Sequence, residues 1–133
     1  VLSIFILSLF FTAITVKDYE GIKKYKSSEL FLTGPIAFLG GGLFESIVWL
    51  ANPLSFFALR AYFKNVKTNL FLSIISFLIA ISFLMWGEIL VAENGRIGLI
   101  LEYNIGYWIW IFLISIILFY NVILVCKSFK ISR

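Results

Sequence analysis

Four long apolar stretches, separated by short polar segments, dominate the sequence. They cover residues 1–16, 35–59, 70–92 and 103–126, and the last of them contains no charged residue. A transmembrane helix needs about 20 predominantly apolar residues. The pattern therefore predicts an all-α integral membrane protein with four transmembrane helices, folded as a single domain over residues 1–133.

The first stretch has a second interpretation, as a secretory signal peptide. Such a peptide needs small residues at a cleavage site after its apolar region. The run Thr12–Val16 fits that requirement poorly. We therefore expect residues 1–16 to form a membrane helix.

The second stretch is too long for one straight crossing, because the 30 residues from Leu30 to Leu59 would form a helix of about 45 Å. Glycines and a proline supply the breaks. We expect this helix to be interrupted or kinked at Gly40–Gly42 and at Asn52–Pro53, since proline removes a backbone donor and disfavours helix in the residue before it. Residues 35–51 then form the crossing, and residues 54–65 bend into the interface.

The connecting segments carry weaker signals. Residues 17–29 combine four lysines with three acids and place Tyr19, Ile22 and Tyr25 at helical spacing. This segment is either a short helix in the membrane interface or a solvated loop. The pair Asn94–Gly95 favours a tight reversal after the third stretch.

Composition supports the membrane assignment and removes several chemistries. The chain is 62% hydrophobic and 14% charged, with a mean hydropathy of +1.04, which no ordinary soluble domain matches. It has no histidine and one cysteine, Cys126. We therefore expect no metal site, no cofactor and no catalytic residues, because histidine-based nucleophile systems and zinc sites cannot be assembled.

The net charge of +4 predicts orientation rather than nucleic-acid binding. Residues 60–67 and 127–133 hold six Lys or Arg and no acid, whereas the other connecting segments hold five basic residues and five acids. Because basic loops favour the cytoplasmic side, we expect both termini in the cytoplasm. The expected location is the plasma membrane, as a multi-pass protein of the bacterial inner membrane.

Two acids lie inside the apolar stretches, and such residues are functional candidates because their desolvation is costly. Glu88 lies close enough to the end of its stretch to reach the interface. Glu45 lies at the bilayer midplane if its helix is continuous from Pro35. If a new helix instead begins near Gly42, Glu45 falls in a first turn, where an acid suits the helix dipole, and the two acids can act together.

Glycines and asparagines complete the set of candidate binding or ion-pathway residues. The run Gly40, Gly41 and Gly42 either exposes backbone groups, as in discontinuous transporter helices, or allows close helix packing. Asn52 either caps the helix at Pro53 or forms a side-chain hydrogen bond with Asn121, since both are expected in the inner half of the bilayer. Ser73, Ser76, Ala80 and Gly87 share one face and predict a helix contact.

These features lead to two hypotheses for function. The first is a non-enzymatic protein that acts through a membrane partner, as an accessory subunit of a membrane complex or as an immunity-type protein. The alternative is a homo-oligomeric channel or transporter for a small ion or solute that uses Glu45 and the glycine break. The expected partners are membrane lipids and either another protein or further copies of the chain, and no nucleic acid.

Overall fold

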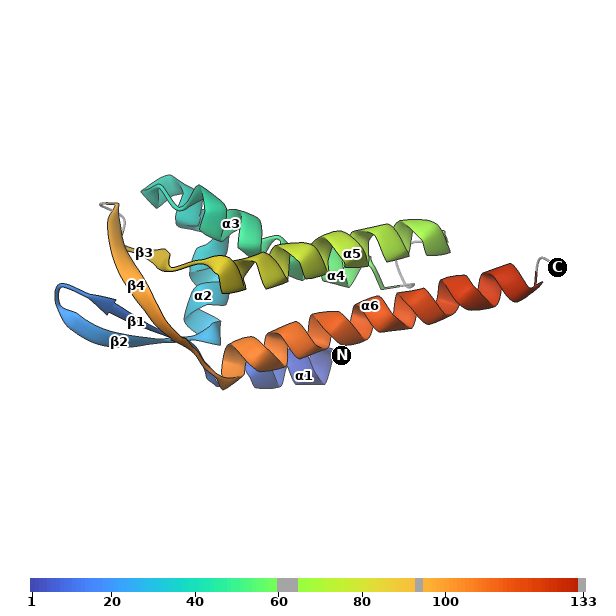
Figure 1. The fold of residues 1–133 in the computed structure, drawn as a ribbon, viewed down its shortest axis with the longest axis horizontal. Coiled ribbons are helices and arrows are strands. Elements are labelled where there is room, and N and C mark those ends of the chain that lie inside the picture. The colour runs from blue at the N-terminus through green and yellow to red at the C-terminus, as the bar shows by residue number, and fades with distance from the viewer. Residues whose placement is uncertain (60–64, 93–94, 132–133) are drawn as a thin grey trace.

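Two long helices run side by side away from a small β-sheet (Figure 1). The computed structural model describes residues 1–59, 65–92 and 95–131. The long helices are α5 (Val66–Ser82) and α6 (Ile105–Ile131). The short helices are α1 (Leu2–Ser8), α2 (Ser27–Thr33), α3 (Leu43–Trp49) and α4 (Ala51–Phe57), together with the 3-10 helices η1 (Gly34–Gly40) and η2 (Phe83–Met85).

The sheet joins two hairpins that are far apart in the chain. Its strands are β1 (Thr12–Asp18), β2 (Gly21–Lys26), β3 (Glu88–Ala92) and β4 (Arg96–Tyr103). They lie in the order β2-β1-β4-β3, and every neighbouring pair is antiparallel. The central pairing is between β1 and β4, which places Ile14 opposite Tyr103.

The prediction of an all-α, multi-pass protein in which all four apolar stretches are transmembrane helices is wrong, because the described residues contain a four-stranded sheet and two helices long enough to span a membrane. The first apolar stretch divides into α1 and β1, and the third ends in β3 rather than continuing as helix. Branched side chains explain the difference, because Thr12, Ile14, Thr15 and Val16 pack better on a pleated sheet than in a helix. The second stretch consists of η1, α3 and α4, none of which is longer than seven residues.

The connecting segments also differ from expectation. Residues 17–29 form neither an interfacial helix nor a loop, because most of them belong to β1 and β2. The expected reversal after the third stretch does occur: Gly95 has a φ of +79° and donates its N–H to the Ala92 carbonyl. Asn94 itself, and residues 60–64 of the expected interfacial bend, lie outside the described residues.

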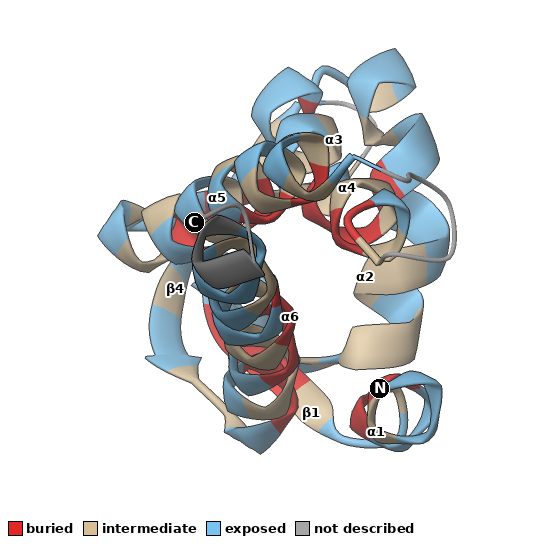
Figure 2. Ribbon diagram, turned by 90° about the vertical axis from the view of Figure 1, so that its right-hand side faces the viewer, coloured by how far each residue is buried: buried red, intermediate tan, exposed pale blue. Residues whose placement is uncertain are grey.

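Two buried clusters hold the elements together. One lies where the sheet meets η2 and the start of α6, and it includes Ile14, Phe83 and Tyr107. The other joins Ala51, Ala80 and Ile114 of α4, α5 and α6. In Figure 2 the buried residues of these three helices face one another, and the outer faces are exposed. Of the four residues predicted to form a helix contact, Ser73, Ser76 and Ala80 are fully buried, whereas Gly87 is exposed and lies beyond α5.

Two helices in the described part of the chain are long and apolar enough to cross a membrane. They are Val66–Met85, with 20 residues, and Ile105–Ser128, with 24 residues. In the most apolar segment of each helix, only 28% and 22% of the residues, respectively, are buried inside the protein. The remaining apolar surface of both helices is therefore uncovered.

Candidate functional site

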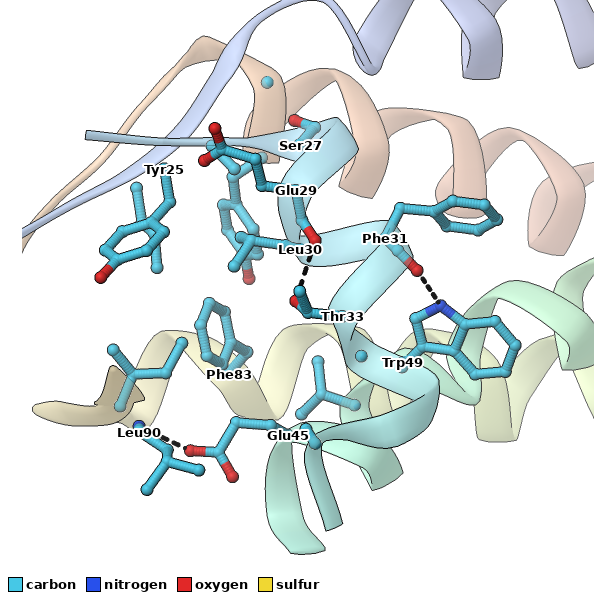
Figure 3. Close-up of a pocket in the computed structure, with 18 of the residues that line it drawn as sticks. Tyr25, Ser27, Glu29, Leu30, Phe31, Thr33, Glu45, Trp49, Phe83 and Leu90 are labelled. Atoms are coloured by element: carbon cyan, nitrogen blue, oxygen red, sulfur yellow. Dashed lines mark hydrogen bonds between the residues drawn. The ribbon is translucent and has the colours of Figure 1, made fainter. Parts of the chain in front are cut away.

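A cavity of about 630 Å³ lies where the sheet meets the short helices (Figure 3). Its walls come from α1 to α4, η1, η2, the first three strands and the start of α6. Pockets for small molecules in proteins span about 300–1,000 Å³ and are mainly apolar with a few polar groups. This cavity has both properties, since aliphatic and aromatic side chains make up most of its lining.

Aromatic rings form one rigid wall. The Phe31 ring meets the Phe5 ring edge-on at 5.3 Å and lies 6.0 Å from the Trp49 ring. The Trp49 indole N–H donates a 2.9 Å hydrogen bond to the Phe31 carbonyl (Figure 3). This bond fixes the indole and holds α3 against α2.

The close approach of η1 to α3 depends on Gly34. A Cβ atom on this residue would lie 2.4 Å from Cδ1 of Trp49, which is closer than atoms can approach. Ser46 strengthens the same junction, because its hydroxyl donates to the Gly34 carbonyl at 2.8 Å and accepts from the Phe38 N–H at 3.0 Å. The side of the cavity formed by η1 is therefore tightly held.

The three candidate glycines form the turn between η1 and α3. Gly40 ends η1, Gly41 has a φ of +94° that favours glycine, and Gly42 is the buried N-cap of α3. The Gly42 N–H donates to the Ala37 carbonyl at 2.8 Å. The expected break at this run is thus present, and the glycines serve a sharp change of direction.

Glu45 lies in the first turn of α3, as expected if a new helix begins near Gly42. The alternative position, halfway along a continuous helix, is wrong. Its carboxylate lines the cavity and accepts a 2.9 Å hydrogen bond from the Leu90 N–H of strand β3 (Figure 3). Glu45 therefore ties α3 to the sheet edge. Glu88 begins β3, is exposed and is outside the cavity lining.

The two candidate asparagines have separate partners, so the predicted bond between them is wrong. Asn52 lines the cavity, accepts from the Trp110 indole N–H at 2.7 Å and donates to the Trp49 carbonyl at 2.9 Å. Asn121 lies elsewhere and donates to the Ala58 and Ile117 carbonyls. Asn52 therefore joins α3, α4 and α6, and it satisfies the carbonyl that Pro53 leaves free.

Charged and polar residues from β2 and α2 line another part of the cavity, and the segment 17–29 that contains most of them was predicted as an interfacial helix or a loop. Lys23 and Tyr25 come from β2, and the Lys23 ammonium lies 5.6 Å from the centre of the Tyr25 ring. Glu29 and Thr33 come from α2, where Glu29 accepts from the Lys26 N–H at 3.1 Å. No alternation of polar and apolar residues marks residues 21–26 as a strand, because Ile22 and Tyr25 are three residues apart.

A second polar cluster lies at the end of the sheet where β1 turns into β2. Arg96 of β4 pairs with Glu20 at 2.6 Å, hydrogen-bonds the Tyr19 hydroxyl and lies over the Tyr19 ring. The hydrogen bond from Arg96 is the main cause that lowers the pKa of Glu20 below its ordinary value. This cluster connects the β1–β2 turn to the second hairpin and is separate from the cavity.

In the described ranges, no three His, Cys, Asp or Glu side chains are grouped so that they could hold a metal ion. Comparison with known proteins adds no identification: no family model, curated protein or solved structure matches the chain. The cavity geometry and the two apolar helices are therefore the basis for any functional conclusion.

Proposed function

We propose that this protein is a membrane-anchored, non-enzymatic binding protein whose cavity holds the apolar part of an amphipathic molecule. In this proposal α5 and α6 form a hairpin within the membrane. The sheet and short helices lie at one membrane surface, where the cavity can take its ligand from the lipid interface. The cavity is the observation that carries the proposal.

The dimensions of the two helices support the membrane anchor. At about 1.5 Å per residue, Val66–Met85 measures about 30 Å and Ile105–Ser128 about 36 Å. The hydrocarbon core of a bilayer is about 30 Å thick. Large apolar side chains on both helices are exposed, as expected for contact with lipid: Phe71, Ile74, Leu78, Ile81, Phe112, Phe119, Val122 and Ile123.

The charges at the far end of the hairpin support an orientation. Lys67 at the start of α5 and Lys127 near the end of α6 lie at the end opposite the sheet (Figure 1). Basic residues that flank membrane helices favour the cytoplasmic side. We therefore place the end of α6 in the cytoplasm and the sheet on the outer surface of the plasma membrane.

The character of the cavity supports a ligand with a long apolar part. At ~30 Å³ per water molecule, 630 Å³ would hold about 20 waters. Apolar cavities do not retain water well, because few wall groups can hydrogen-bond to it. An alkyl chain can pack against the aromatic and aliphatic side chains of the wall. Lys23, Glu29 and Glu45 provide polar contacts for a head group.

The proposal keeps the non-enzymatic class expected from the sequence and narrows the partner to a small amphiphile. The channel hypothesis depended on Glu45 lining a path. The hydrogen bond from Leu90 to Glu45 favours a role in holding α3 against β3 instead. Neither a protein partner nor an oligomer is needed for this proposal.

Energy transfer from tryptophan to a neutral dansyl-labelled dodecyl chain tests the proposal in nanodiscs, because Trp49 and Trp110 line the cavity. We expect saturable transfer at one probe per chain, displaced by unlabelled dodecanol. Thr33→Phe, which fills the cavity, should weaken binding at least about tenfold. Leu32→Phe changes the neighbouring residue on the same helix, which does not line the cavity, and should leave binding unchanged. Equal binding to both variants would overturn the proposal.

A further inference from the structure

The charged groups that line the cavity do not balance. They are Lys23, Glu29 and Glu45, so the lining carries one net negative charge. In the described part of the chain, the ion pairs join Arg96 to Asp18 and Glu20. Neither Glu29 nor Glu45 forms an ion pair with a lysine or arginine there. The cavity therefore offers an acidic group without a cationic counterpart of its own.

The three charged residues differ in their exposure to solvent and in their contacts within the protein. Lys23 is exposed on edge strand β2, and its ammonium is close to the Tyr25 ring. Glu29 is also exposed, and its carboxylate caps the start of α2 by accepting from the Lys26 N–H. Glu45 is half-buried, so its charge is the one with least access to solvent.

The carboxylate of Glu45 has capacity for a further partner. An ionised carboxylate has about four acceptor positions, and the Leu90 N–H occupies one of them. The surrounding wall is apolar, with Phe83 and Leu90 on the same side of the cavity in Figure 3. A charge in such surroundings is stabilised by pairing with an opposite charge, and aromatic ring faces also attract cations.

We propose that the ligand is a lipophilic cation, with an alkyl chain along the aromatic wall and an ammonium group beside Glu45. This inference rests on the proposed function, because it assigns the head group of the same cavity's ligand. Both features of the ligand match the wall: the chain fits the apolar lining, and the ammonium compensates the net negative charge. Lys23 at the exposed edge would disfavour a second cation there.

Matched amphiphiles test the head group. Dodecyltrimethylammonium, dodecanol and dodecyl sulfate share one chain and differ in charge, and each competes with the neutral dansyl probe in nanodiscs of zwitterionic lipid. We expect the cation to bind about tenfold more tightly than the alcohol, which corresponds to about 1.4 kcal/mol. The anion should bind more weakly than the alcohol.

Glu45→Gln removes the charge but keeps an oxygen that can accept from the Leu90 N–H. We expect this variant to lose the preference for the cation, so that the cation and dodecanol bind equally well. Glu88→Gln removes an exposed acid outside the cavity and should keep the preference. If Glu45→Gln fails to fold, Glu45→Asp serves instead, since it retains the charge and should retain the preference.

The outcomes separate the two proposals. If none of the three dodecyl amphiphiles displaces the probe, the proposed binding function is wrong. If the cation and the alcohol bind equally well, the cavity binds amphiphiles but the assignment of a cationic head is overturned. Tighter binding of dodecyl sulfate that is lost in Lys23→Gln would also overturn it, and would assign an anionic head group to the edge of β2.

Discussion

Replacing Gly34 with alanine should destabilise the protein through a single steric contact. The added Cβ would lie 2.4 Å from Cδ1, 2.7 Å from Cγ and 2.9 Å from Cβ of Trp49. Ordinary contacts begin near 3.4 Å, so the indole must retreat by about one ångström. Overpacking of this kind costs about 1–3 kcal/mol, and loss of the Trp49–Phe31 hydrogen bond adds about 1 kcal/mol.

The expected loss of about 2–4 kcal/mol corresponds to a fall in Tm of roughly 10 °C for a chain of this size. Thermal unfolding of the purified protein in detergent, followed by circular dichroism, measures it. Gly87→Ala is the matched control, because a Cβ there meets nothing within 4 Å, and its Tm should change by no more than ~2 °C.

A double-mutant cycle identifies the contact responsible. In a Trp49→Ala background most of the clashing atoms are gone, so Gly34→Ala should cost less than half of its effect in the wild type. If Gly34→Ala lowers the Tm no more than Gly87→Ala does, the packing of η1 against α3 described above is incorrect.

Three further predictions follow from other parts of the molecule. Because Arg96 lowers the pKa of Glu20 in the folded state, the stabilisation from this pair is present above the ordinary carboxyl value of 4.5 and is lost as the pH falls through the folded-state pKa. Hydrogen exchange in β4, corrected for intrinsic rates, should therefore accelerate on acidification in the wild type but not in Glu20→Gln; identical profiles would contradict this. Asn52→Ala leaves the Trp110 indole and a backbone carbonyl without their partner, so it should lower stability by about 1–3 kcal/mol, and Trp110→Phe should cost little more in that background. Lys127 is exposed at the basic end of α6, so Lys127→Cys in a Cys126→Ser background should be labelled by an impermeant maleimide only after the cell membrane is opened, and labelling of intact cells would reverse the proposed orientation.

A helix could be predicted from the sequence where a long stretch is uniformly apolar. The stretch 103–126 is uncharged, and α6 extends over it from Ile105 to Ile131. The glycine run marked a real break, because a positive φ at Gly41 favours glycine. The break expected at Asn52–Pro53 lies instead at Leu50, between α3 and α4, and Pro53 occupies the first turn of α4. The long helix and the glycine turn are local features, and therefore each can be recognised from neighbouring residues.

The sheet could not be recognised in the same way, because a short apolar run fits a strand and a buried helix equally well. β3 is a clear case: residues 88–92 continue the apolar stretch of α5, with Glu88 as the one charged residue among them. They become a strand because β4 offers backbone partners, as in the pairing of Ile89 with Gly98. The choice depends on tertiary contacts rather than on local composition.

The cavity was even less accessible from the sequence. It depends on contacts such as the bond from Trp49 to Phe31 and the bond from Leu90 to Glu45, whose partners are 18 and 45 residues apart. Glu45 was identified as a candidate because acids are rare in apolar stretches. Its partner could not be, since a backbone N–H has no signature in the sequence.

The β1–β4 pairing also determines how the protein can fold. Thr15 and Asn104, which hydrogen-bond beside this pairing, are 89 residues apart, and closing a flexible loop of that length costs roughly 4 kcal/mol of chain entropy. Each hairpin can form early because its strands are adjacent, whereas the sheet can close only after β4 has been synthesised. During synthesis, the backbone groups of β1 that pair with β4 therefore stay unpaired until β4 has been made. The slow step in folding should be the docking of the two preformed hairpins, and substitutions in β1 that face β4 should slow folding more than substitutions in the outer strand β2.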